Sequence, residues 1–309
     1  MDRREFVKNV LRFGGTFSLG AMVLPKTVKA QILKPMIDEY CRSYWDIRVK
    51  EGIDSLRSAN PRLLLGDTHV HSLHSDGKYS VLQILSRAYA LGLDYVVLTE
   101  HITPKRYNVK APLLSHQSQE ESLKVLQDMG IKPPEIYPAA EISAEEGHLI
   151  VLFPKSYFGA KDFSREFHSA FAICGERFVD AAEIIGKVKT LGGKVIVPHP
   201  GETTRWRKSF GVPWEILEGP LQGIVDGVED MNTGNGCFGS FAAELGLSSL
   251  GASDDHFKAL IGTSVTAYDG LQYSDLTDAI AGKATQGFQT ARVNPTLLHA
   301  SLFFYAWQV

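Results

Sequence analysis

The chain has few cysteines, no large excess of charge of either sign and no long apolar run. Among its 309 residues, 32 Lys and Arg face 35 Asp and Glu, which gives a net charge of −3. Without a broad basic surface, we do not expect it to bind nucleic acid or anionic lipid. No internal stretch approaches the roughly 18 apolar residues that a membrane-spanning helix needs, so we expect no membrane span in the mature protein.

The three cysteines, Cys41, Cys174 and Cys237, include no C-x-x-C pair. Three thiols cannot all pair within one chain, so the sequence predicts no disulfide framework and leaves open whether two of them form a bridge. The apolar fraction of 44% and the charged fraction of 22% are those of an ordinary globular protein. The length suits one large α/β domain, or at most two domains.

The N-terminus differs from the rest of the chain. Arg3 and Arg4 precede an aromatic residue, a mildly apolar Gly-rich run and a small residue at Ala30. This pattern resembles a twin-arginine signal peptide over residues 1–30, which predicts the twin-arginine export machinery as a partner and a periplasmic or otherwise exported protein. The alternative is a disordered basic N-terminus or an amphipathic helix. Because no Cys stands at the cleavage site, a lipoprotein anchor is not expected.

Strand-like and helix-like segments alternate after a helical N-terminal extension at residues 31–60, which we expect to pack outside the main fold. Helical spacing is clearest at residues 80–91 and 178–191, where apolar residues recur at i, i+3, i+4 and i+7. Ser80 is the expected N-cap of the first helix, and Gly92 its expected stop. Short apolar runs predict strands at residues 63–71, 95–101, 136–142, 148–153, 195–199, 224–231 and 247–253.

This alternation predicts an α/β fold with a parallel sheet and helices outside it. Seven strands with polar residues mostly at their C-terminal ends favour a closed or nearly closed (β/α) barrel, similar to a TIM barrel, over an open sheet. In such barrels the active site lies at the C-terminal face. No linker or low-complexity tract divides the region, so we expect one catalytic domain at residues 61–309.

Six of the ten histidines fall in short clusters beside these strands. In Asp67-Thr68-His69-Val70-His71, residues two apart in a strand point the same way, so both imidazoles can face one metal ion. The other cluster residues are Asp76, His101, Glu141, His148, His199, Asp254 and His256. Imidazoles and carboxylates at several strand ends are the ligands that divalent metals take.

Each of these signals is weak alone. An H-x-H pair also occurs on exposed strands, Asp76 before Gly77 is a favoured turn residue, and His101 alone fits a core position. The joint pattern is stronger, because so many unpaired acids and imidazoles at strand ends are costly without a shared partner. A metal cluster is such a partner.

In order, spacing and neighbouring residues, these clusters resemble the polymerase and histidinol phosphatase (PHP) family, over about Leu63 to Val293. The resemblance implies a distorted seven-stranded (β/α) barrel with the metal site at the C-terminal ends of the strands. It also implies up to three divalent ions, commonly Zn, Mn or Fe, and hydrolysis of phosphate esters.

Carried over by residue, the resemblance implies three groups of ligands. The first group is His69, His71, Glu141 and Asp254; in the second, Glu141 bridges to an ion held by His148 and His199; the third is Asp76, His101 and His256. Two positions depart from the family pattern. Glu100 replaces the usual Asp before His101, and Asp255 adds an acid beside Asp254.

The mechanism expected from such a site uses a water that bridges two ions. Its pKa falls from ~15.7 toward ~7, and the resulting hydroxide attacks phosphorus in line, with no covalent intermediate. Glu141 is the expected catalytic bridge, and Asp255 is free for proton transfer or support of a ligand. A small-molecule phosphate ester is the expected substrate.

After His199, a loop carries three cations, Arg205, Arg207 and Lys208, that are candidates for binding the phosphate. A solvated loop is an equal alternative for them. Asn232, which follows Glu229 in a Glu-x-x-Asn pattern, is a further candidate for substrate binding, with a supporting structural role as its alternative.

Two other functions stay open. One is a metal-dependent hydrolase of an amide or lactone, since other metallohydrolase barrels also begin with H-x-H. The other is a non-catalytic exported protein that binds metal or a ligand, against which the intact ligand set argues. Polymerase proofreading and histidinol phosphate hydrolysis fit poorly with an exported chain.

Overall fold

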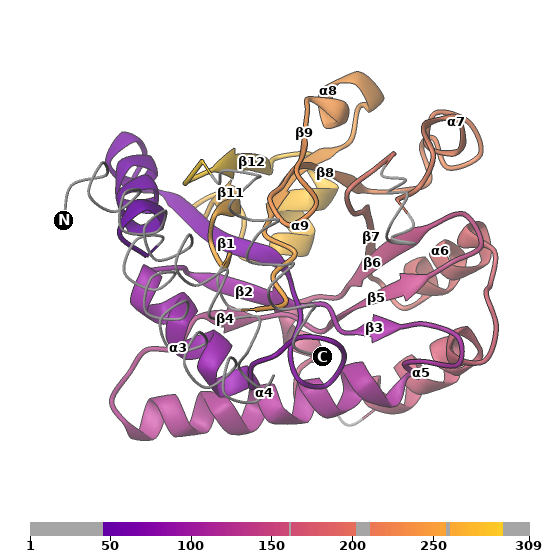
Figure 1. Cartoon of the computed structure of the whole chain (residues 1–309), viewed down its shortest axis with the longest axis horizontal. Helices are drawn as coiled ribbons and strands as arrows, with labels where there is room; N and C mark the ends of the chain where they lie inside the picture. Colours follow the sequence, from indigo (N-terminus) through magenta and orange to yellow (C-terminus); the bar gives the residue numbers. More distant parts are fainter. Residues whose placement is uncertain (1–45, 161, 202–210, 258–259, 293–309) are drawn as a thin grey trace, which may run out of the picture. The chain divides into compact units, whose positions relative to one another are not determined.

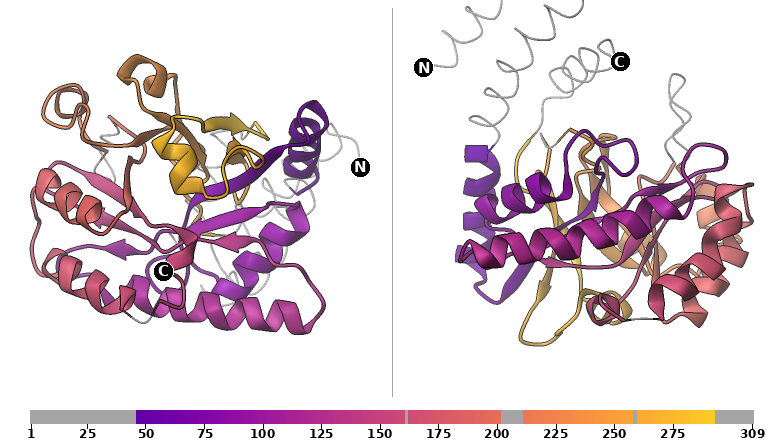
Figure 2. Two further views of the ribbon diagram at one scale, coloured as in Figure 1. Left: turned by 180° about the vertical axis from the view of Figure 1, so that it is seen from behind. Right: turned by 90° about the horizontal axis from the view of Figure 1, so that it is seen from below.

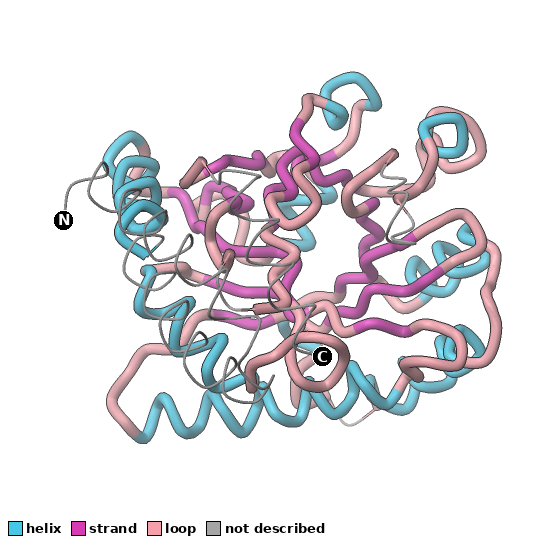
Figure 3. Tube along the Cα trace, in the orientation of Figure 1, coloured by secondary structure: helices cyan, strands magenta, loops and turns pink. Residues whose placement is uncertain are grey.

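A computed structural model describes residues 46–160, 162–201, 211–257 and 260–292, which fall within one compact unit, Trp45–Val293. Within it, strands lie inside and most helices outside (Figures 1 and 3). The expected α/β class is confirmed. No helix among the described residues is long and apolar enough to cross a bilayer.

The strands are β1 (Leu63–Val70), β2 (Tyr95–Leu98), β3 (His101–Ile102), β4 (Glu135–Ile136), β5 (Ala139–Ser143), β6 (His148–Leu152), β7 (Lys194–Val197), β8 (Gly227–Asn232), β9 (Cys237–Phe238), β10 (Ser248–Ala252), β11 (Ser264–Asp269) and β12 (Gln286–Gln289). After a helix at residues 46–59, the α-helices are α3 (Val81–Leu91), α4 (Lys110–Asp128), α5 (Phe163–Phe171), α6 (Ala181–Thr190), α7 (Trp214–Leu217), α8 (Phe241–Leu245) and α9 (Leu276–Ala281), with 3-10 turns η1 (Lys155–Tyr157) and η2 (Ala172–Gly175).

The helix predicted at residues 80–91 is confirmed as α3. The Ser80 side chain accepts from the Gln83 backbone N–H and the Gln83 side chain accepts from the Ser80 backbone, which is a capping box. Gly92 ends the helix with φ 83°, a conformation that glycine adopts without strain. The second predicted helix is α6, which begins at Ala181 after the N-cap Asp180, three residues later than expected.

Residues 46–59 form a helix that was expected to lie outside the main fold. Instead, its Val49 and Ile53 are buried in the same hydrophobic core as Leu65 on β1 and Leu91 on α3. Burial of apolar side chains at about 25 cal/mol per Å² favours this packing. The described part of the predicted extension therefore belongs to the compact unit.

The strands form two sheets, and the predicted closed seven-stranded barrel is not confirmed. One sheet has the order β12-β11-β1-β2-β4, and the other has the order β10-β8-β7-β6-β5-β3, with β9 paired to β8. Among the described strands, no ladder joins the sheets; a single bridge pairs Val70 with Asp255. The pairing is also mixed, since β6 runs antiparallel to both β5 and β7, and β11 antiparallel to β1.

Interruptions in two of the predicted strands explain why there are two sheets. The predicted strands at 95–101 and 136–142 each divide, so that β2 and β4 join one sheet while β3 and β5 join the other. Pro138 lies at the second break, and proline cannot donate to a ladder. The seven predicted strands are thus nine shorter or shifted ones in the structure, and β9, β11 and β12 were not predicted.

The antiparallel β6 follows from the length of the loop before it. β5 ends at Ser143 and β6 begins at His148, which pairs directly with Ser143. A loop this short makes a hairpin, because a parallel connection needs a crossover of a dozen or more residues. The start of β6 therefore lies beside the end of β5, and this places His148 next to Glu141.

Side chains from both sheets fill the space between them. Tyr95 on β2, Ile150 on β6 and Tyr268 on β11 belong to one buried cluster. Helices α5 and α6 pack on the outer side of β5–β8, whereas α3 lies beside β1 and β2; Figure 2 shows both sets from behind. The interior is a packed core, and the polar cluster lies at one end of it.

Candidate metal centre

The structure brings all nine predicted ligands together. Contacts of 4.0 Å or less join them into one connected cluster, most of it buried. They come from the end of β1 and the loop after it, from the starts of β3 and β6, from the interior of β5 and from the residues just after β7 and β10. The members are His69, His71, Asp76, His101, Glu141, His148, His199, Asp254 and His256.

The first pocket is formed by His69, His71, Glu141 and Asp254. The two Nε2 atoms are 3.0 Å apart, and each lies 3.3–3.4 Å from Glu141 Oε2 and from Asp254 Oδ1. Four ligands arranged as a tetrahedron around a zinc ion at roughly 2.0–2.2 Å are about 3.4 Å from one another. The distances around the two imidazoles fit ligands of one metal ion, and the ligand atoms of His69, His71 and Glu141 all lie within 4.8 Å of one another.

The second pocket uses the other oxygen of the same glutamate. Glu141 Oε1 lies 2.7 Å from His148 Nδ1 and 3.4 Å from His199 Nε2. Glu141 thus has one oxygen in each of two adjacent pockets, which is the position that a carboxylate bridging two metal ions takes.

The third pocket is formed by Asp76, His101 and His256. Asp76 Oδ1 lies 3.4 Å from His101 Nε2 and 3.2 Å from His256 Nε2. This pocket is more open than the others, because the side chains of Asp76 and His256 are 23% and 22% exposed, whereas those of His69 and Glu141 are at most 1% exposed.

Two imidazoles lie between pockets, which the sequence did not indicate. His71 points Nε2 into the first pocket, and its Nδ1 is 4.0 Å from Asp76 Oδ1. His101 points Nε2 toward Asp76, and its Nδ1 is 3.1 Å from Glu141 Oε2. The rings of His71 and His101 stack with centroids 4.4 Å apart. The three pockets are therefore contiguous.

The donor set fits divalent cations. The buried Nδ1 of His71 has no hydrogen-bond partner among the described residues, and Asp76 Oδ1, His101 Nδ1 and Glu141 Oε1 have only other predicted ligands as close polar neighbours. A buried polar atom without a partner costs about 1–3 kcal/mol, and more when charged. Imidazole nitrogens with carboxylate oxygens are the ligands of Zn, Mn or Fe rather than of Ca or Mg alone.

The electrostatics of the cluster favour added positive charge. Burial lowers the pKa of His69, but Asp254, Glu141 and Glu229 outweigh it and hold that pKa well above the usual range. Burial would raise the pKa of Glu141, but His148, His101 and His69 hold it well below the usual value. The field that favours a proton on these imidazoles also favours a metal cation between them.

Two of the ligands have strained backbones. His199 has φ 29° and Asp254 has φ 50°, in the region that side chains other than glycine rarely adopt. Such residues persist where the surrounding structure fixes them, and they cluster at functional sites. Both lie just after strands, β7 and β10, so the strain turns each side chain toward Glu141 or His69.

Glu229 on β8 orients the first pocket from outside it. Its Oε1 lies 2.9 Å from His69 Nδ1, and its Oε2 accepts from the His199 backbone N–H at 3.0 Å. The Asn232 amide donates to the same Oε2 at 2.6 Å. A carboxylate on Nδ1 fixes the imidazole so that Nε2 faces the metal.

The hydrogen bonds of Asn232 and Asp255 differ from those that their predicted roles require. Asn232, a candidate for substrate binding, is fully buried, and it holds Glu229 and accepts from the Asn235 N–H, so its polar atoms are used within the protein. Asp255 Oδ1 accepts from the backbone N–H groups of Phe257 and Leu260, which shapes the turn after β10. A proton-transfer role for Asp255 stays a prediction, and Arg205, Arg207 and Lys208 lie outside the described residues.

Two acids that are not predicted ligands support the centre from outside it. Buried Asp67 accepts from the backbone N–H groups of Ser253 and Gly262, and burial raises its pKa to about 7 against these donors. Glu100 accepts from three serines. For Asp67 the only signal was an acid two positions before a predicted ligand, whereas Glu100 stands where the family pattern has Asp before His101.

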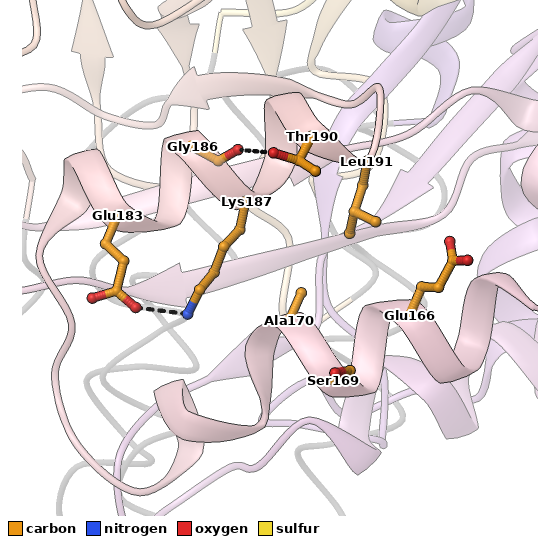
Figure 4. Close-up of a pocket in the computed structure, with 8 residues that line it drawn as sticks. All are labelled: Glu166, Ser169, Ala170, Glu183, Gly186, Lys187, Thr190 and Leu191. Carbon is orange, nitrogen blue, oxygen red and sulfur yellow. Dashed lines mark hydrogen bonds and ion pairs between the residues drawn. The ribbon is translucent and has the colours of Figure 1, made fainter.

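A separate hollow of about 580 Å³ lies between α5 and α6 (Figure 4). Its lining includes Ala170, Leu191 and the ion pair of Glu183 with Lys187, at 2.7 Å. None of its lining residues belongs to the histidine cluster, so the two places are distinct.

No protein-family model and no curated protein matches the chain. Solved structures do. PsfC from Pseudomonas syringae PB-5123 is 18% identical with a TM-score of 0.51, over 79% of this chain and 99% of that one. At this identity the likeness shows a shared fold and nothing about activity.

Two further structures are similar at lower TM-scores. One is a two-domain protein from Bacteroides vulgatus ATCC 8482 containing a predicted PHP-like metal-dependent phosphoesterase, with 19% identity and a TM-score of 0.49 over 74% of this chain. This chain spans 65% of that protein's length. The other is Endonuclease Q bound to a 27-mer duplex, with 15% identity and a TM-score of 0.47 over 72% of this chain and 58% of that one.

Proposed function

We propose that this protein is a metal-dependent phosphoesterase of the PHP type that holds up to three divalent ions, Zn, Mn or Fe. The observation that carries the proposal is Glu141, which has one oxygen in each of two adjacent pockets. A third pocket lies within 4.0 Å of the first through His71 and Asp76. Contiguous pockets for two or more cations suit phosphoryl transfer, in which negative charge is spread over several oxygens.

When bound, the ions would polarise a phosphoryl oxygen and lower the pKa of water toward neutrality. The protein supplies the rest. Glu229 fixes the orientation of His69, and the buried walls around Glu141 exclude bulk water. Since Asp76 and His256 are the more exposed ligands, the substrate enters from the third pocket.

We propose a small-molecule phosphate ester as the substrate, with Arg205, Arg207 and Lys208 as candidates for binding its phosphate. These cations follow His199 closely in the sequence, which supports the assignment. A guanidinium binds a phosphate bidentately.

We also propose export by the twin-arginine route and a periplasmic location, because Arg3 and Arg4 precede a weakly apolar run and Ala30. Twin-arginine export carries folded proteins, so the ions would be loaded before export. An N-terminal reporter fusion, compared with an Arg3→Lys, Arg4→Lys double variant, tests this proposal by the cell fraction in which the reporter is found.

The activity test compares hydrolysis of a chromogenic phosphomonoester, its matching diester and a DNA oligonucleotide by protein loaded with Mn²⁺ or Zn²⁺. Turnover that disappears in His199→Ala and persists in His168→Ala supports the proposal, because His168 is an exposed histidine outside the cluster. A Glu141→Ala protein with full metal content and full activity would contradict the bridging role.

The alternative is hydrolysis of an amide or lactone at the same centre, since the ligand set does not itself select phosphorus. Bound metal with no turnover of any phosphate ester would favour this alternative over phosphoester hydrolysis. A chain that binds metal and hydrolyses neither class would be a non-catalytic binding protein.

A further inference from the structure

Glu100, between β2 and β3, is a fully buried carboxylate whose hydrogen bonds come from serines. Its Oε1 accepts from the Ser72 hydroxyl and, at 3.0 Å, from the Ser115 hydroxyl. Its Oε2 accepts from the Ser75 hydroxyl, and the Ser72 backbone N–H lies 3.2 and 3.3 Å from the two oxygens. Several donors on one carboxylate stabilise its charged form without a neighbouring cation.

Two of these serines lie on the loop that carries Asp76. Ser72 follows the ligand His71 directly, and Ser75 precedes Asp76 directly. The hydroxyl of Ser72 also accepts from the His74 N–H at 3.3 Å, so the turn itself is held together. Glu100 therefore binds both ends of the short segment between the ligands His71 and Asp76.

The same carboxylate connects the loop to two other elements. Ser115 belongs to α4, and its hydroxyl also accepts from the Gln119 amide at 3.2 Å. The backbone carbonyl of Glu100 accepts from the Glu141 N–H at 3.1 Å. The loop, α4 and the strand of the bridging glutamate thus meet at Glu100.

We propose that Glu100 is a positioning residue for the third pocket, holding Asp76 against His101 and His256. This inference rests on the proposed metal centre. Glu100 touches the loop through hydroxyl groups rather than touching the third-pocket atoms, so its effect on metal binding passes through Asp76. The first pocket is also held from another side by Glu229, which contacts His69, so we expect it to be less affected by loss of the Glu100 carboxylate.

The test is the metal content of the Glu100→Gln protein, measured by elemental analysis after equilibration at fixed free Mn²⁺ or Zn²⁺. The amide keeps the shape but turns a donor toward serine donors and the Ser72 N–H. We expect the wild-type protein to bind about three ions and the variant about two, with the weakest ion bound about 10- to 100-fold less tightly. Excess metal should restore the third ion.

The matched control is Asp275→Asn. Asp275 is also a buried carboxylate, which accepts from the hydroxyl and backbone N–H of Thr277 and from the Lys155 backbone N–H, but it caps α9 and contacts no predicted ligand in the described part of the chain. We expect the control to lower the melting temperature without changing metal content. Ser75→Ala should show a weaker form of the Glu100→Gln effect, and the double variant should be less than additive.

Glu100→Gln protein that melts cooperatively and binds as many ions as wild type, with the same affinities, overturns the positioning role. Loss of all ions to the same degree also overturns it, because the effect would then be general. Wild-type protein that binds no metal would instead overturn the metal centre itself, so the two failures are distinguishable.

Discussion

Glu229 is not itself a proposed metal ligand, yet it fixes two of the ligands. It pairs with Nδ1 of His69 at 2.9 Å and accepts from the backbone of His199 at 3.0 Å. Both contacts are fully buried, so nothing in the solvent can replace them. At the scale of the residue, the geometry of the centre depends on such supporting groups as much as on the ligands.

We therefore expect Glu229→Gln to weaken metal binding by about 10- to 100-fold, because an amide oxygen is a poorer acceptor for the His69 N–H. Competition with a chromophoric chelator measures the affinity. Unchanged affinity in a folded Glu229→Gln protein would contradict the supporting role.

The sequence predicted which acids and imidazoles lie together, but not the hydrogen bonds that support them. His69 and His71 stand out because their spacing and their place after an apolar run are local features. Glu100 shows the opposite case, because its partners Ser72 and Ser115 come from a loop and a helix that only the fold brings together. Serines at those positions carry no signal of their own.

At the scale of the element, α4 shows why a helix was missed. Its inward face is polar, with Ser115, His116, Gln119 and Ser122 buried, so apolar residues do not recur with a helical period. His116 packs near the rings of Phe158, Phe163 and Phe167, and its Nε2 accepts from the Ala139 N–H on β5 at 3.3 Å.

His116 gives the fold a measurable sensitivity to acid. Burial lowers its pKa from 6.5 to about 4. Between these values the unfolded chain binds a proton that the folded protein does not, so the free energy of unfolding falls as the pH drops from 6.5 toward 4. We expect this residue to contribute about 3 kcal/mol of that loss.

Denaturant unfolding of wild-type and His116→Gln proteins at several pH values tests this expectation. The metal ligands are the same in both, so their contributions cancel in the difference. The variant should lose less stability over that range, whereas parallel curves would contradict the assignment.

At Gly251, the backbone of β10 lies very close to the backbones of β11 and β12. A Cβ on Gly251 would lie 2.3 Å from the Val265 carbonyl oxygen and 3.0 Å from the Phe288 nitrogen. The Gly251 N–H donates to the Thr266 hydroxyl at 2.9 Å, so a side-chain hydrogen bond stands there in place of a backbone–backbone one. Only glycine allows this approach.

We expect Gly251→Ala to lower the free energy of unfolding by about 1–3 kcal/mol, since the backbone must move to admit the methyl group. Gly186→Ala is the matched control. Gly186 lies on the exposed face of α6, and a methyl group added there would have nothing within 4 Å, so alanine should stabilise by up to about 1 kcal/mol. Chemical denaturation of both variants measures the change in the free energy of unfolding. Equal changes in the two variants would contradict the packing argument.

At the scale of the whole unit, the α/β class was predictable and the barrel was not confirmed. Alternation of apolar runs and amphipathic helices indicated the class. Whether the sheet closes into a barrel depends on where strands are interrupted, as at Pro138, and on which strands run antiparallel. The loop between Ser143 and His148 is so short that its length alone indicated a hairpin. The two sheets still gather the ligands, because strand ends meet at one edge of both.

The measurement that tests the central claim most directly is titration of metal-free protein with Mn²⁺ or Zn²⁺, following bound metal and phosphate-ester turnover in the same samples. We predict that turnover appears only as ions fill the pockets and reaches its plateau at about two to three ions per chain. Turnover that is independent of bound metal, or protein that takes up no metal at these pockets, would contradict it.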